Sequence, residues 1–186
     1  YGEPAIMVVG FEGSKDHVLR ARREVMNIFK ARRGFDLGTS VGVSWAKDKF
    51  NLPYLRDVVM DRGVMVDVAE TSTPWANVLP LYRKVRQAVK AKFAAEGTPG
   101  FLGLHISHTY ETGCCLYFTY ACRQLPGREL EQYYSYKRMI TDVFTRNGAT
   151  LSHHHAVGTE HRPWLEGEVS PTGVRALRAL KASLDP

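Results

Sequence analysis

FLGLHISHTY at residues 101–110 and CCLYFTYAC at residues 114–122 are the two β-rich runs that decide the fold. Only Glu111-Thr112-Gly113 separates them, which is typical of an antiparallel hairpin. Antiparallel strands exclude a purely parallel sheet. The hairpin therefore predicts an α+β fold, with a largely antiparallel sheet covered by helices that lie mainly on one face.

Residues on either side of the hairpin alternate between strand and helix patterns. In chain order we expect a strand at 5–12, a helix capped by Ser14 and stopped by Gly34, an irregular connection at 35–50, a helix at 52–61, a strand at 64–70, a helix opened by Thr73-Pro74, a helix at 128–146, a strand at 149–155 and a helix after Pro163. The length of 186 residues corresponds to one domain, which we assign to residues 1–186.

Basic residues give the chain a formal net charge of +6. Most of them fall on two expected helices, as Arg20, Arg22, Arg23, Lys30, Arg32 and Arg33, and as Arg83, Lys84, Arg86, Lys90 and Lys92. No stacking aromatics or Gly-rich RNA-binding signature accompany them, so a solvated helix face is favoured over nucleic-acid binding. Anionic lipid headgroups or a phosphorylated substrate remain alternative partners for this positive charge.

Cysteine usage and hydropathy indicate the compartment. Cys114, Cys115 and Cys122 make an odd count without a CxxC spacing, which argues against a secreted disulfide framework. The adjacent pair should face opposite sides of its strand as small buried residues. No apolar run approaches the roughly 20 residues of a membrane span. We expect a cytoplasmic location, and peripheral membrane contact and homodimerisation stay open.

The run Ser152-His153-His154-His155 is the most unusual feature of the sequence. On the expected strand, His153 and His155 would point to one face and His154 to the other. Burying an imidazole is unfavourable unless its nitrogens are hydrogen-bonded, and imidazole titrates near neutral pH. The run therefore indicates a site for proton transfer or cofactor contact. A solvated edge strand is the alternative.

A metal site is a second interpretation of the same run, because an HxH pair on a strand can chelate zinc or iron. His105, His108 and His161 are candidates for the third ligand, but no spacing singles one out. We expect proton transfer or cofactor contact here and no metal.

Two further residues are candidates for chemistry. Tyr117 shares a strand face with Thr119, and its alternative interpretation is ordinary strand packing. Arg56 has the planar donor pattern that captures a phosphate or carboxylate, although a surface arginine paired with a nearby acid would look the same.

An ordered set of segments resembles one known family. The segments are Tyr54–Asp57 (YLRD), Glu70–Ser72 (ETS) with Pro74-Trp75, His105–Tyr110 (HISHTY), Leu116–Phe118 (LYF), Leu151–Gly158 (LSHHHAVG) and Trp164-Leu165. Together they are similar to the C-terminal domain of FAD-linked oxidases of the vanillyl-alcohol-oxidase type, and they most resemble the alkyl-dihydroxyacetonephosphate synthases. Ala156 departs from the pattern, since this family usually has glycine there.

The resemblance implies an elaborated ferredoxin-like cap domain that binds substrate and covers the reactive edge of FAD, while a separate N-terminal domain outside this chain binds most of the cofactor. It implies that Tyr117 transfers a proton, that Arg56 holds the substrate phosphate, and that His153, His154 and His155 are catalytic and contact the flavin. The implied reaction exchanges the acyl group of acyl-dihydroxyacetonephosphate for a fatty alcohol, in ether lipid biosynthesis. The chain alone would then be inactive.

Two other functions stay open. FAD-dependent 2-hydroxy-acid oxidases or dehydrogenases of the glycolate or D-lactate type resemble this domain, but they typically carry an acidic residue and a single His at the place of His153–His155. A non-catalytic module that binds lipid phosphate through its basic helices is the third candidate.

Overall fold

The computed structural model describes residues 5–185, without the side chains of residues 52 and 53. The chain divides into two compact units, Tyr1–Leu55 and Arg56–Pro186.

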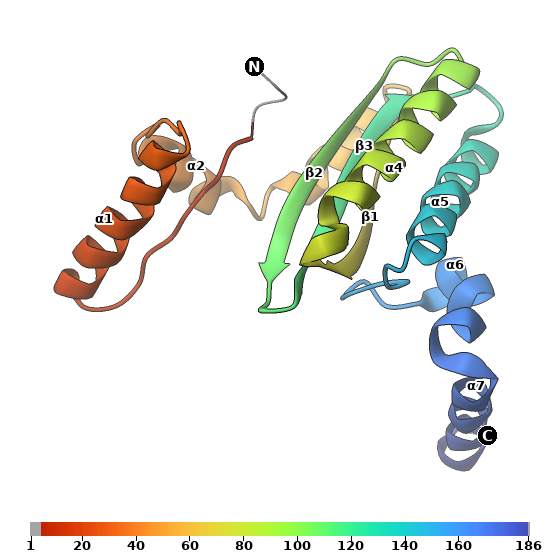
Figure 1. The fold of residues 1–186 in the computed structure, drawn as a ribbon. Coiled ribbons are helices and arrows are strands. Elements are labelled where there is room, and N and C mark those ends of the chain that lie inside the picture. Colours follow the sequence, from red (N-terminus) through yellow and green to blue (C-terminus); the bar gives the residue numbers. More distant parts are fainter. Residues whose placement is uncertain (1–4, 186) are drawn as a thin grey trace. The chain divides into compact units, whose positions relative to one another are not determined.

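The first unit is helical where it has regular structure. It holds α1 (Lys15–Ala31) and α2 (Ser40–Asp48) (Figure 1). The boundary between the units falls within α3 (Leu52–Met60). Ser14 caps α1 by accepting from the His17 N–H at 3.4 Å, and the Gly34 N–H closes its other end on the Phe29 carbonyl, as expected.

Two expectations for the first unit are wrong. Residues 35–50 are not wholly irregular, because α2 lies within them. The expected strand at 5–12 is absent, and Ile6 and Met7 are 75% and 70% exposed. A strand needs a partner for its backbone N–H and C=O groups, and the described residues of this unit form no other strand.

The second unit contains the sheet and confirms the α+β prediction. Its elements are β1 (Val64–Pro74), α4 (Trp75–Ala95), β2 (Gly100–Thr109), β3 (Gly113–Arg123) and α5 (Glu129–Arg146). The strand order is β1-β3-β2 and both pairings are antiparallel, so the hairpin strand β3 is central (Figure 1). At the hairpin turn, a Cβ on Gly113 would lie 2.2 Å from the Thr73 carbonyl oxygen, and only glycine fits there.

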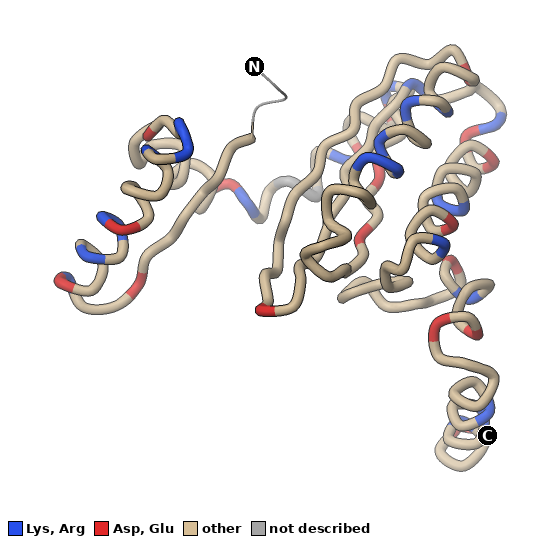
Figure 2. Tube along the Cα trace, viewed as in Figure 1, with Lys and Arg blue, Asp and Glu red and all other residues tan. Residues whose placement is uncertain are grey.

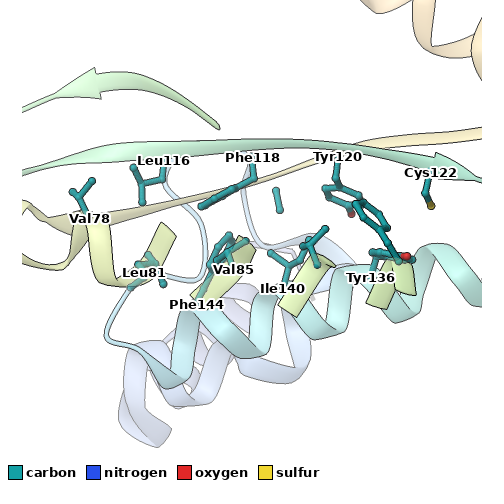
Figure 3. Packing of buried hydrophobic residues seen from close by; sticks show 14 of the residues in the cluster. Val78, Leu81, Val85, Leu116, Phe118, Tyr120, Cys122, Tyr136, Ile140 and Phe144 are labelled. Atoms are coloured by element: carbon teal, nitrogen blue, oxygen red, sulfur yellow. The ribbon is translucent and has the colours of Figure 1, made fainter. Parts of the chain in front are cut away.

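The hydrophobic core lies between the sheet and the helices α4 and α5 (Figure 3). Leu116, Phe118 and Tyr120 of β3 are fully buried against Val85 of α4 and Ile140 of α5. The helical spacing of apolar residues predicts that one face of α4 carries Val78, Tyr82, Val85 and Val89. The structure confirms this face, because the three valines are buried and Tyr82 is partly buried.

The buried stripe of α5 differs from the expectation in its first turns. The helical spacing of apolar residues predicts an inward face made of Leu130, Tyr133, Tyr134, Ile140 and Phe144. Ile140 and Phe144 are buried, but Leu130 and Tyr134 are 67% and 42% exposed. The stripe begins instead at Gln132, which is buried and bonded to the Leu125 N–H and the Arg123 carbonyl. A polar residue with its hydrogen bonds satisfied can occupy a core position that hydrophobicity alone would not assign to it.

The expected strand at 149–155 is not formed, although its first residues follow the edge of β1. The Thr150 N–H donates to the Ser72 carbonyl at 3.0 Å, and the Ser72 N–H donates to the Thr150 hydroxyl at 2.8 Å. This segment therefore takes the place of the fourth, outer strand of a ferredoxin-like β-α-β-β-α-β unit. From Ser152 onward it turns away from strand geometry.

The chain ends in helices, as expected. They are α6 (Gly158–His161), a single 3-10 turn (Arg162–Trp164) and α7 (Leu165–Leu184), which is kinked at Ser170. The Trp164 indole N–H donates to Asp142 of α5 at 2.8 Å and anchors this tail. The helical spacing predicts one apolar face on α7, made of Val174, Leu177, Leu180 and Leu184. The leucines of this face are exposed, at 51% for Leu177 and 80% for Leu184.

Lys and Arg residues are spread along α1 and α4 (Figure 2). The basic side chains of α1 are exposed, and those of α4 are exposed or half-buried. Within the described residues, no helix has the length and apolar character of a membrane span.

Candidate active site on the open face of the sheet

The two faces of β3 meet different surroundings. Leu116, Phe118 and Tyr120 face the core, whereas the alternate residues Cys115, Tyr117 and Thr119 face away from α4 and α5. The pairing register adds three residues of the neighbouring strands to this open face. Glu70 of β1 and His105 of β2 lie opposite Tyr117, and Ser72 of β1 lies opposite Cys115. Polar and ionisable groups therefore gather on one side of the sheet.

The Glu70 carboxylate organises the histidine run. Its Oε1 accepts the Ser152 hydroxyl at 2.6 Å and the backbone N–H groups of His153, His154 and His155 at 2.8, 2.9 and 2.9 Å. Successive N–H groups of a strand point to opposite sides, so three of them cannot converge on one carboxylate in a strand. They form a backbone nest around the anion, which is why the expected strand and its division of the three histidines between two faces are wrong.

This arrangement fixes the charge of Glu70, whose side chain is buried. Burial by itself would raise the pKa of the carboxyl group, but the hydrogen bonds from Ser152 and from the three backbone N–H groups lower it from 4.5 to about 2. Glu70 is therefore a permanent anion beneath the histidines at neutral pH.

The imidazole rings cluster on the open face beside Tyr117. Its ring stacks on that of His154 at a centroid distance of 6.4 Å and meets the edge of the His155 ring at 5.3 Å. His153 turns toward the hairpin turn, where its Nε2 lies 3.0 Å from the Tyr110 hydroxyl. The structure thus brings Tyr117, His154 and His155 together and holds His153 next to them.

The protonation states of Tyr117 and His155 are complementary. Burial, followed by the charges of Asp67 and Glu70, raises the pKa of the Tyr117 phenol. Burial lowers the pKa of His155, although the Glu70 charge opposes this change. At neutral pH the site therefore offers a protonated phenol next to a neutral imidazole that can accept a proton.

Arg56 lies on α3 and is exposed. Among the described residues, no hydrogen bond or ion pair joins it to Tyr117 or to the three histidines. Its charge acts instead at Tyr133, where burial and the hydrogen bond to Glu160 raise the pKa of the phenol and Arg56 opposes that rise. No acid among residues 5–185 forms an ion pair with this guanidinium, which can therefore take an anionic ligand.

Sequence reasoning missed three residues of this site. Glu70 and Cys115 are buried, and the Cys115 thiol donates to Glu70 at 3.5 Å. Glu70 could have been found because it is an ionisable residue in an apolar strand. Cys115 could have been found because strand alternation places it on the same face as Tyr117. His108 was considered only as one of three possible metal ligands, and a β-bulge that the sequence does not reveal sets its direction.

Ala156, at the end of the histidine run, has a φ of 66°. This left-handed conformation is readily adopted by glycine and unfavourable for residues with a Cβ. The positive φ therefore gives a physical reason for the glycine that the sequence resemblance leads us to expect at this position.

The chain matches the family described as FAD linked oxidases, C-terminal domain, over residues 1–186. It belongs to that family. As a member of the FAD-linked oxidase C-terminal domains, it is 38% identical over 181 residues to an alkyldihydroxyacetonephosphate synthase of Dictyostelium discoideum and 34% identical over 182 residues to one of Trypanosoma brucei brucei. These alignments cover 97% and 98% of this chain and 30% of each relative.

A solved structure of an alkyldihydroxyacetonephosphate synthase is also similar to this FAD-linked oxidase domain. The TM-score is 0.73 and the sequence identity 35%, and the match covers 95% of this chain and 29% of the solved one. The FAD-linked oxidase domain thus spans about 30% of the length of the relatives it matches.

Proposed function

We propose that this domain is the substrate-side half of an FAD-dependent transferase that replaces the acyloxy group of acyl-dihydroxyacetonephosphate by the alkoxy group of a fatty alcohol and releases the fatty acid. The observation that carries the proposal is the meeting of Tyr117, His154 and His155 on the open sheet face of a chain that is similar to alkyldihydroxyacetonephosphate synthases. Most of the FAD would be bound by a domain outside residues 1–186.

The residues of the open face fit a flavin ring. The rings of Tyr117 and His154 are stacked, and His154 and His155 are exposed, so they offer flat surface and imidazole N–H donors toward the carbonyls and nitrogens of a flavin. When bound, FAD supplies the electron-accepting ring system at which the carbon–oxygen bond is exchanged.

Tyr117 and His155 would move the proton of the reaction. Exchange at a carbon next to a ketone requires a proton to leave that carbon and later to return. Because the Tyr117 phenol is protonated, it can take the substrate proton only while passing its own to a neighbour. Neutral His155, in edge contact at 5.3 Å between ring centroids, is the nearest acceptor of suitable pKa.

Glu70 would position these groups without touching substrate. Its anion fixes the backbone of all three histidines, so the imidazoles are held before substrate arrives. Arg56 would hold the substrate phosphate, which suits an exposed guanidinium.

The test uses the intact, flavin-loaded protein with acyl-dihydroxyacetonephosphate and a labelled fatty alcohol. We expect labelled alkyl product together with released fatty acid, and no bleaching of the flavin by glycolate or D-lactate. Bleaching by a 2-hydroxy acid without alkyl exchange would establish the oxidase alternative. Failure of both reactions, with liposome binding that persists in Arg56→Ala, would favour a lipid-phosphate-binding module.

A matched pair of arginine variants tests the phosphate contact. Arg56→Ala should raise KM for acyl-dihydroxyacetonephosphate and leave KM for the fatty alcohol unchanged. Arg138→Ala, at an exposed position on α5, should leave both constants unchanged. Equal effects of the two variants would remove Arg56 from the proposal.

A further inference from the structure

Four side chains from three separate parts of the chain converge at one end of the open sheet face. They are His108, Cys115, His153 and His154, and their ligating atoms all lie within 4.8 Å of one another. We propose that these four residues bind one divalent cation of the zinc type. The proposal does not depend on the transferase function.

The hairpin presents two of the ligands because β2 is irregular. The pairing of β2 with β3 shifts between Ile106 and Thr109, so a bulge contains Ser107 and His108. On a regular strand these two side chains would point to opposite faces. The bulge lets His108 reach the open face, where it approaches Cys115, and bulges commonly re-aim side chains at functional sites.

The three imidazoles form an almost equilateral group. The centroid distances are 5.0 Å for His108 and His153, 5.1 Å for His108 and His154, and 5.2 Å for His153 and His154. His153 Nδ1 and His154 Nδ1 lie 3.0 Å apart. Nitrogens bonded to a tetrahedral zinc ion at about 2.0 Å lie roughly 3.3 Å apart, so a small movement allows both lone pairs to point at one ion.

Outer hydrogen bonds already orient two of the rings. The Ser107 hydroxyl lies 2.9 Å from His108 Nδ1, and the Tyr110 hydroxyl lies 3.0 Å from His153 Nε2. Each contact can hold a ring N–H and leave the opposite nitrogen as an electron-pair donor, which is the usual second shell of a metal-bound histidine. Glu70, whose Oε2 lies 3.5 Å from His154 Nδ1, adds a negative charge beside the cluster.

The ligand set determines the kind of ion. One thiolate and three imidazoles suit the tetrahedral preference and borderline softness of zinc, whereas calcium and magnesium require oxygen ligands. Cys115 is a free, buried thiol, so binding would form a sulfur–metal bond and release the thiol proton to solvent. His108 and His154 are exposed, which gives an ion a path from solvent to the sulfur.

The experiment uses the intact flavoprotein after treatment with a chelator. Titration with zinc chloride, followed by calorimetry and by metal analysis after gel filtration, should show one equivalent bound and a higher Tm. Cobalt chloride should give the visible d–d bands of a tetrahedral ion, with a sulfur-to-cobalt band that Cys115→Ser removes. His108→Ala alters an exposed side chain and should weaken zinc binding at least tenfold.

Two matched controls make the assignment specific. Cys114→Ser changes the adjacent buried thiol on the core face of β3, and His105→Ala changes a histidine of the open face outside the cluster. Both should keep the zinc stoichiometry and the Tm increase. Absence of zinc uptake by the parent protein would overturn the proposal, and so would uptake that Cys115→Ser and His108→Ala leave unchanged.

Discussion

The two faces of β3 carry residues of similar kinds, but these residues have different roles on each face. Cys114 and Tyr120 on the core face lie under α4 and α5 as packing residues, whereas Cys115 and Tyr117 on the open face contact an anion and imidazoles. Each pair is one cysteine and one tyrosine of the same strand. Side chains that point to the core face therefore contribute to stability, and side chains that point to the open face belong to the candidate active site.

The two tyrosines also differ in how their hydroxyls are held. The Tyr120 hydroxyl donates to buried Asp67 at 3.0 Å, within a network that Lys137 completes by an ion pair of 2.8 Å. The Tyr117 hydroxyl forms no such closed network among the described residues. A phenol that is to exchange a proton with substrate must have its hydroxyl available, and only the open face provides one.

The strongest test of this contrast is Tyr117→Phe in the intact flavoprotein. We expect alkyl exchange to fall by roughly 10²–10⁴-fold, the usual contribution of a positioned proton-transfer group, with FAD still bound and the Tm unchanged. Steady-state kinetics and the flavin spectrum measure the two effects. Retained turnover would remove Tyr117 from the proton path.

The second test removes the anion that shapes the histidine loop. Glu70→Gln replaces a charged acceptor of hydrogen bonds from Ser152, Cys115 and three backbone N–H groups by an amide whose N–H₂ group faces some of these donors. We therefore expect the free energy of unfolding to fall by roughly 2–4 kcal/mol. Urea unfolding measures this change. Glu131→Gln, which alters an exposed ion pair with Arg128, should have little effect.

Acid should have a related effect through the same carboxylate. The folded pKa of Glu70, about 2, lies below the ordinary 4.5, so its contribution is complete above pH 4.5 and is lost as pH falls toward 2. The difference corresponds to roughly 3 kcal/mol at most. The free energies of unfolding of the parent protein and of Glu70→Gln, measured between pH 7 and pH 2, should become equal in acid. A difference between them that does not change with pH would show that the stabilisation does not come from ionised Glu70.

The sequence predicted the hydrophobic core better than it predicted the candidate active site on the open face. Strand alternation and helical spacing identified the hairpin, the long helices and the buried residues Val85 and Ile140, because those patterns are local. The histidine run was identified as a site, but its conformation was wrong because Glu70, some 80 residues earlier in the chain, imposes it. The β-bulge that brings His108 to the cluster likewise has no local signal.

A third substitution tests the core face with the matched tyrosine. Tyr120→Phe removes the hydrogen bond to Asp67 but leaves the ion pair with Lys137, so we expect roughly 1–2 kcal/mol lower stability. The turnover of the folded protein should be unchanged. A large loss of turnover at full stability would mean that the two faces of β3 are not separate in function.

The smallest expected effect lies at the end of the histidine loop. Ala156 holds a φ of 66°, and relieving a left-handed alanine is worth about 1 kcal/mol. Glycine adds flexibility to the unfolded chain, which offsets part of this gain. Ala156→Gly should therefore raise the free energy of unfolding by up to about 1 kcal/mol without changing turnover, as measured by urea unfolding and kinetics. A loss of stability would show that Ala156 makes packing contacts that outweigh the strain of its backbone.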